Sequence, residues 1–210
     1  TLVELAIALM VIGLLIGGVL KGQELIENAR VTAAVRQLKA YDAAAMIFRN
    51  TYGAIPGDIK KPNRIPNCST DICNLPGNGN GKINVGVNPE YEQFNFFPHL
   101  TKAGMIQGPE GGTQAEMDAA NNTDEGWEKF FPENQFGYYI KIDALDDKDA
   151  YAIDGPLRAM AAVDAKMDDG LPWKGDIRIE SCETIGDYPD GDYNTNIPDY
   201  LCDLWVRVGF

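Results

Sequence analysis

The stretch that decides the fold is residues 1–23, "TLVELAIALMVIGLLIGGVLKGQ". One charged residue, Glu4, precedes an apolar run from Leu5 to Leu20, which approaches the roughly 20 residues that a helix needs to cross a bilayer. An acidic side chain in the middle of a membrane costs about 2.5–3.5 kcal/mol, so Glu4 is a candidate functional residue whose partner has to be found.

The order of charges around this run is not that of a secretory signal peptide. Such a signal places Lys or Arg before the apolar core and a small-residue cleavage site after it; here the sequence continues as "GQELIENARVTAAVRQLKAYDAAAMIFRNTYG". Apolar residues recur in it at helical steps of three and four, while charged residues take the other faces. We therefore predict one helix over residues 1–52, apolar all round in its first half and amphipathic in its second. It is about 75 Å long and is capped by Gly53 before Pro56. The apolar positions are Leu25, Ala29, Ala33, Leu38, Tyr41, Ala44, Ala45 and Phe48.

Charge is distributed unevenly along the chain. The 210 residues carry a net charge of −13, yet the first fifty hold five basic and four acidic residues. An acidic remainder repels phosphate backbones, so broad nucleic-acid binding is not expected. We expect two units, the helix of residues 1–52 and a globular head of residues 53–210.

The four cysteines lie in irregular stretches of the head. Cys68 and Cys73 belong to a long segment rich in Gly, Pro and Asn, and Cys182 and Cys202 bracket a second irregular stretch. Four cysteines allow three pairings, and proximity favours Cys68 with Cys73 and Cys182 with Cys202, in an oxidising compartment. The alternative, a zinc site that also uses His99, fits the spacing poorly.

The remaining head sequence predicts an α+β fold. Residues 89–108 have helical periodicity, although Pro98 should break or kink the helix, and residues 156–175 contain a short helix that ends at an Asp-Asp-Gly turn. Short, partly alternating segments predict an antiparallel sheet; they are residues 136–143, 150–154, 175–180 and 201–208.

The sequence offers little for catalysis. His99 is the single histidine, and Ser69 and Ser181 are the two serines, which leaves no convincing pair of nucleophile and base. The motif "GNGNGK" lacks the frame of a phosphate-binding loop and predicts tight turns with positive φ. We therefore expect neither an enzyme nor a cofactor.

One acidic loop, "DYPDGDYNTN", has the oxygen-rich composition that calcium prefers, without the spacing of an EF-hand. A solvated acidic loop is the favoured interpretation and a calcium site the alternative. The candidate ligands are Asp187, Asp190, Asp192, Asn194 and Asn196.

The N-terminal segment "TLVELAIALMVIGLLIGG" resembles that of type IV pilins and type II secretion pseudopilins. Mature chains of that family begin Phe-Thr-Leu-x-Glu-Leu with an N-methylated Phe, so this chain starts one residue later. Short head segments such as "YGAIPGD" and "HLTKAGMIQG" are similar to pilin-like proteins in patches. Many pilins carry a proline near Lys21, where this chain has glycines.

The resemblance implies roles for residues of the helix. It places the assembly contact at Thr1, Leu2, Val3, Glu4 and Leu5, with the Glu4 carboxylate paired to the terminal amine of a neighbouring subunit. The alternative is a membrane anchor in which Glu4 reaches back to the interface. Because interior glycines weaken a helix, a segment that melts in the fibre is expected at Gly13, Gly17, Gly18 and Gly22. The bridge between Cys182 and Cys202 would resemble the disulfide-bounded C-terminal region of many pilins.

The function implied is that of a structural subunit of an extracellular type IV pilus-like filament. Its partners would be further copies of itself, a prepilin peptidase, the pilus assembly machinery and, before assembly, the inner membrane. A pseudopilin or minor pilin of a type II secretion or competence system is the alternative, and the presence of Glu4 favours the repeating subunit. An enzyme on a membrane tether is a third, poorer alternative.

Overall fold

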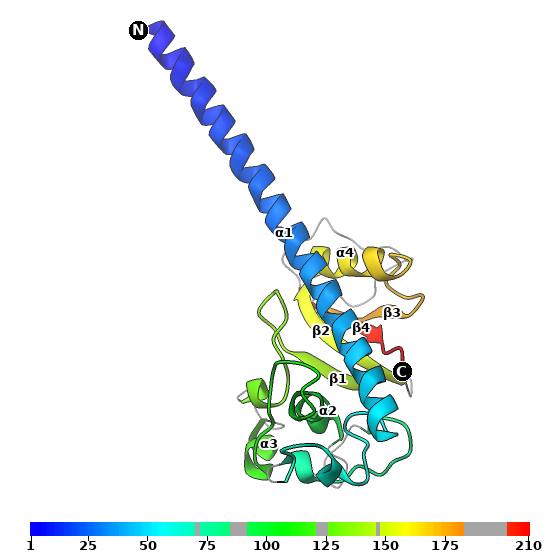
Figure 1. Cartoon of the computed structure of the whole chain (residues 1–210). Coiled ribbons are helices and arrows are strands. Elements are labelled where there is room, and N and C mark those ends of the chain that lie inside the picture. Colours follow the sequence, from blue (N-terminus) through cyan, green and yellow to red (C-terminus); the bar gives the residue numbers. More distant parts are fainter. Residues whose placement is uncertain (70–71, 85–91, 121–125, 146–147, 183–200) are drawn as a thin grey trace.

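A single long helix carries a head of shorter helices and a four-stranded sheet (Figure 1). The structure is a computed structural model that describes residues 1–69, 72–84, 92–120, 126–145, 148–182 and 201–210. The N-terminal half of the long helix projects away from the head, and its C-terminal half lies along it (Figure 1). The fold is α+β, as predicted.

Helix α1 spans Leu2–Tyr52 and ends where the sequence predicted. Gly53 takes a left-handed conformation with φ 74°, and its N–H donates to the Arg49 carbonyl at 2.8 Å. Glycine suits this cap because it has no Cβ to oppose a positive φ. The side chains that α1 buries in the head share one face of its second half; they are Val31, Ala34, Leu38, Tyr41, Ala44, Ala45 and Phe48.

The sheet confirms the four predicted strands and their antiparallel pairing. Its strands are β1 (Ile140–Leu145), β2 (Lys148–Pro156), β3 (Ile177–Cys182) and β4 (Leu201–Arg207). Their order is β1-β2-β4-β3, so that β4 lies between β2 and β3.

The other α-helices are α2 (Glu92–Lys102), α3 (Gln114–Ala120) and α4 (Leu157–Met167). Single 3₁₀ turns occur at Pro62–Arg64, Ile72–Asn74 and Trp127–Lys129. Of the two effects predicted for Pro98, a break or a kink, the break does not occur, because α2 continues through Pro98 to Lys102. A proline inside a helix removes one backbone donor, and the buried side chains on both sides of Pro98 hold α2 against the core.

Aromatic side chains join α1, α2 and the sheet into one core. The ring of Tyr41 on α1 lies 5.1 Å from that of Phe97 on α2 and 6.3 Å from that of Tyr151 on β2. Phe96 also contacts Tyr151, with ring centroids 6.0 Å apart. The second half of α1 is therefore an integral part of the head.

Candidate functional site

The most unusual surface of the molecule is the first half of α1. Its side chains up to Arg30 are exposed apart from the half-exposed Gly22, and Val31 is the first buried one. The apolar part is long and hydrophobic enough to cross a membrane by length and composition, which are also properties of a signal segment. An exposed apolar helix of this length needs a cover, either lipid or other apolar helices.

The predicted assembly residues lie at the free end of this helix. Thr1 and Glu4 form a capping box: the Glu4 N–H donates to the Thr1 hydroxyl at 3.4 Å, and the Thr1 nitrogen donates to the Glu4 carboxylate. Leu2, Val3 and Leu5 are exposed, Leu2 to 89%. Among the described residues the Glu4 carboxylate therefore has a partner only at the start of its own helix, and both groups are exposed and accessible to a neighbour.

The four glycines of the predicted melting zone lie in unbroken helix. A Cβ added at Gly13, Gly17, Gly18 or Gly22 would meet no atom within 4 Å, apart from the backbone of its own helix and its chain neighbours. The packing of the single chain therefore does not require glycine at these positions. Any requirement for glycine at these positions therefore comes from contacts outside the subunit.

The predicted bridge between Cys68 and Cys73 is present, with Cα atoms 5.4 Å apart. The structure also brings His99 to this bridge, which its distance in the sequence did not suggest. The sulfur atoms and a ring nitrogen lie within 4.8 Å of one another. Because the disulfide occupies both thiols, this group does not offer the thiolates that a zinc site needs.

His99 is a buried structural residue. Its Nδ1 accepts a hydrogen bond from the Gly57 N–H at 2.8 Å, which leaves Nε2 to donate to the Cys73 carbonyl at 2.9 Å. Burial lowers the pKa of His99 to about 4. The side chain thus ties the loop after α1 to the disulfide loop and is neutral at physiological pH.

The second predicted bridge is supported by the register of the sheet. The backbone pairs Cys182 on β3 directly with Cys202 on β4, and directly opposed residues of an antiparallel pair have Cβ atoms about 4.5–5.5 Å apart. The link between their sulfur atoms stays a prediction. The calcium candidates Asp187, Asp190, Asp192, Asn194 and Asn196 lie outside the described residues.

The "GNGNGK" loop wraps around buried carboxylates. The Asp58 carboxylate accepts hydrogen bonds from the N–H groups of Gly79, Asn80 and Gly81. Gly79 and Gly81 have φ values of 68° and 82°, as the sequence predicted for this motif. Asp58 is 1% exposed, so the loop serves to cover a buried charge.

Glu92 holds both ends of the same loop. Its carboxylate accepts from the Asn78 N–H at 2.8 Å and from the Asn84 N–H at 2.7 Å. Burial, followed by the nearby Asp58 carboxylate, raises the pKa of Glu92 to about 7. Sequence reasoning missed this arrangement because its carboxylates come from distant parts of the chain, and Asp149 on β2 adds a third acceptor, for the Ile83 N–H at 2.9 Å.

A second acidic group lies at the C-terminal end of α4, with Asp164 inside the helix and Asp168 and Asp169 just after it. Carboxylate oxygens of Asp164, Asp168 and Asp169 lie within 4.8 Å of one another. Asp168 accepts the N–H groups of Asp176 and Ile177, and Asp169 accepts that of Leu171. These carboxylates stabilise the turns between α4 and β3.

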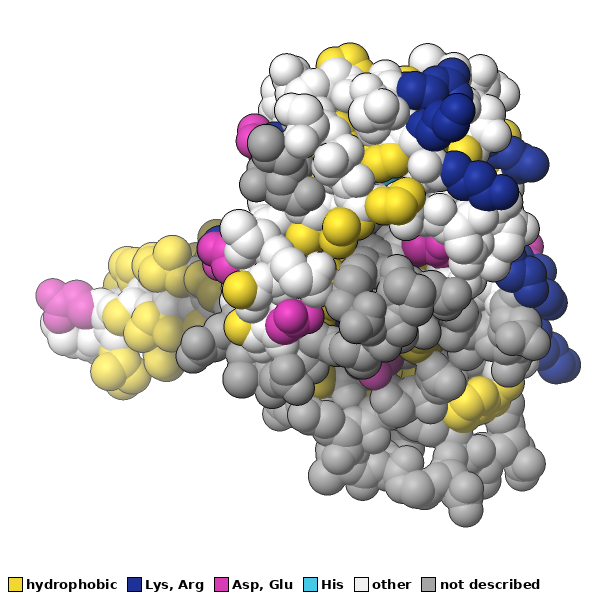
Figure 2. All heavy atoms as spheres, turned by 90° about the horizontal axis from the view of Figure 1, so that it is seen from below, with side chains coloured by type: hydrophobic (Ala, Val, Ile, Leu, Met, Phe, Trp, Pro, Cys, Tyr) yellow, Lys and Arg dark blue, Asp and Glu magenta, His cyan; other side chains and the backbone are white. Residues whose placement is uncertain are grey.

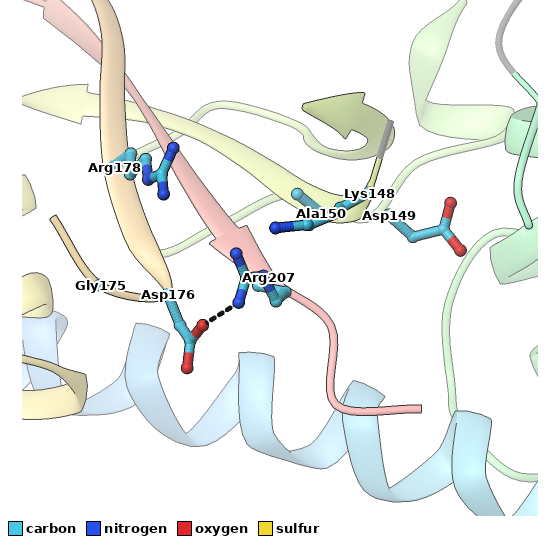
Figure 3. Close-up of a pocket in the computed structure, with 7 residues that line it drawn as sticks. All are labelled: Lys148, Asp149, Ala150, Gly175, Asp176, Arg178 and Arg207. Carbon is cyan, nitrogen blue, oxygen red and sulfur yellow. Dashed lines mark hydrogen bonds and ion pairs between the residues drawn. The ribbon is translucent and has the colours of Figure 1, made fainter. Parts of the chain in front are cut away.

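A small charged pocket lies at one end of the sheet, where β2 and β3 begin and β4 ends (Figure 3). Arg207 on β4 forms an ion pair with Asp176, while the carboxylate of Asp149 points away from them (Figure 3). The cavity of about 20 Å³ has room for about one water molecule. It is too small for an organic substrate.

Comparison of the chain with protein-family models, with curated protein sequences and with solved structures finds no match. The long apolar N-terminal helix, the antiparallel sheet and the Cys68–Cys73 disulfide fit a pilin-like fold.

Proposed function

We propose that the protein is a structural subunit of an extracellular type IV pilus-like filament, which polymerises by packing the first half of α1 against the same helix in other copies. The observation that carries the proposal is the exposed apolar half of α1, which has an acidic residue at its end. Before assembly the bilayer would cover this surface, and in the filament neighbouring helices would do so.

Glu4 favours assembly over simple anchoring. In an anchor the Glu4 carboxylate would serve only the first turn of its own helix, against the desolvation cost that such a group adds in an apolar environment. In a packed fibre the same carboxylate can pair with the terminal amine of the next subunit, so that two costly groups neutralise each other. The pair would then select the axial position at which a new subunit stops.

The test is Glu4→Leu, expressed as the full chain in cells that lack the native copy. The substitution would leave a neighbour's amine buried and unpaired, and breaking a buried pair costs about 3–5 kcal/mol. Since about 1.4 kcal/mol corresponds to a tenfold change, the equilibrium constant for adding each subunit would fall by two to four orders of magnitude. We expect normal insertion into the membrane and few or no sheared filaments.

Glu27→Leu is the matched control, since it removes one carboxylate from the same helix outside the apolar run, and its filaments should persist. Abundant filaments from Glu4→Leu would overturn the assembly role of Glu4, whereas a wild-type chain that inserts into the membrane without forming filaments would overturn the proposed function and favour the membrane-anchor interpretation.

The alternative of a pseudopilin or minor pilin differs in abundance. Mass identification of the main protein in sheared filaments separates the two, because a repeating subunit dominates and a minor one is a trace component.

A further inference from the structure

A basic groove opens at the end of the head where α1 stops. Its volume is about 560 Å³, and it lies between the last turn of α1, the loop after it and the loop around Gly79 and Gly81. Figure 2, which views this end of the head, shows Lys and Arg side chains gathered along one side. We call this hollow the basic groove. The cationic residues that line it are Arg49, Lys60, Lys61 and Arg64.

The side chains of these cations are exposed. Among the residues that the structure describes, no carboxylate lies within 4.0 Å of their charged atoms. Arg64 donates to the Tyr52 carbonyl at 3.2 Å, which satisfies one of the last acceptors of α1. Asp58 also lines the groove, but it is buried and its oxygens accept the N–H groups of the glycine loop.

Four positive charges that have no carboxylate partner in the described part of the chain repel each other across the groove. The repulsion is relieved when an anionic surface enters. The rest of the chain is acidic, with a net charge of −13 for the whole protein. A free polyanion would be repelled by most of the head. Another copy of this chain would bring carboxylates while its apolar helix supplied the main attraction.

The position of the groove agrees with contact between copies. It lies at the end of the head opposite to the projecting half of α1 (Figure 1). Subunits that stack with parallel helices would bring this end of one head toward the helix-bearing end of the next. Such a head-to-tail contact joins two different surfaces and extends without closing, which generates a helical filament.

We propose that the basic groove receives acidic side chains from the head of the next copy in the filament. The inference rests on the proposed function and adds to it a second contact, between heads, that is electrostatic where the helix contact is apolar. This contact offsets the electrostatic repulsion between subunits that carry the same net negative charge. It also determines the rotation of each subunit about the filament axis relative to the next.

The experiment compares full-length chains in cells that lack the native copy. Lys60→Glu/Lys61→Glu reverses two charges of the groove, Lys60→Arg/Lys61→Arg keeps them, and Lys148→Glu/Lys174→Glu makes the same change of net charge outside the groove. Because like charges placed across an interface repel strongly, and about 1.4 kcal/mol corresponds to a tenfold change, we expect at least about a tenfold lower ratio of filament to inserted subunit for the first variant. The other two should stay within about twofold of wild type.

A zero-length carbodiimide cross-link provides the second measurement. Wild-type filaments should give a dimer through an amide between a lysine of the groove and a carboxylate of another chain. The arginine variant should still form filaments but lose most of this dimer, because a guanidinium does not react. Two controls distinguish a lost contact from misfolding. A peptide map should show that the Cys68–Cys73 disulfide is intact in each variant. Lys60→Gln/Lys61→Gln, which removes the two charges without reversing them, should have an intermediate filament yield.

Wild-type yield from the glutamate variant, or an unchanged dimer in the arginine variant, would overturn the inference. Binding of heparin by wild type but not by the glutamate variant, with assembly unaffected, would also overturn it and assign the groove to an external polyanion. Failure of the wild-type chain itself to form filaments would instead refute the proposed function.

Discussion

The backbone N–H of Gly57 donates a hydrogen bond to Nδ1 of His99 at 2.8 Å, deep in the head. This contact determines the tautomer of the ring, since Nδ1 must be free of a proton to accept it. The loop after α1 is thereby tied through one imidazole to the Cys73 carbonyl.

We expect His99 to stay neutral across the physiological range. Burial lowers its pKa to about 4, so the unfolded chain takes up a proton first, and stability should decrease as pH falls from about 6.5 to about 4. NMR titration of the single histidine, in the full chain in detergent, should show no change between pH 5.5 and pH 8. A midpoint near 6.5 would contradict the buried contact.

Glu92 should produce the opposite trend at higher pH. Its pKa of about 7 in the folded state lies above its ordinary value, so the stabilisation it gives is complete in acid and is lost as pH rises through 7. Between pH 6 and pH 8 the loss is about 1 kcal/mol, or about 2–4 °C in Tm. Thermal unfolding of the full chain measures it, and Glu92→Gln should flatten the slope. The partly buried Asp154, whose pKa is also raised to about 7 by burial and then by Asp203, adds to the trend. A Tm that rises over this range would refute both assignments.

The register of β3 and β4 predicts a disulfide between Cys182 and Cys202. A closed loop of about 20 residues contributes roughly 3 kcal/mol in the chain-entropy estimate. Cys202→Ser should therefore lower filament yield, whereas a serine on the exposed surface should not. A peptide map without reducing agent is decisive, since free thiols or crossed pairs would exclude this bridge.

The glycine zone of α1 should behave differently in the membrane and in the fibre. The helix is continuous in the single subunit, as the requirement for backbone hydrogen bonds in a bilayer predicts. We expect a melted or stretched segment between Gly13 and Gly22 after assembly. Because each Gly→Ala change stabilises a helix by about 1 kcal/mol, Gly17→Ala/Gly18→Ala should insert normally and assemble less well. Unbroken helical density in a wild-type filament map would disprove the melting.

Local signals in the sequence predicted much of the fold. The end of α1 followed from helical periodicity and a glycine cap, and the strands from short apolar segments between turns. Helix α3, at Gln114–Ala120, has seven residues, too few to show a clear period. The position of β4 between β2 and β3 depends on pairing between distant segments, which no local pattern contains.

The site was predicted in the same uneven way. The exposed, apolar first half of α1 could be expected from the uncharged run of residues 5–20. The clamp of Asp58 and Glu92 on the glycine loop and the basic groove could not, because each gathers residues from separate parts of the chain. The motif "GNGNGK" correctly predicted turns, but not the carboxylate that those turns enclose.

The continuity of α1 has a mechanical consequence. No linker separates the exposed apolar half from the half whose side chains Val31 to Phe48 lie in the core of the head. Tension along a fibre built on this helix would pass directly into the head, so the core itself would bear the load. The four glycines would then be the most compliant part of the path, and a pulled fibre should lengthen there before any head unfolds.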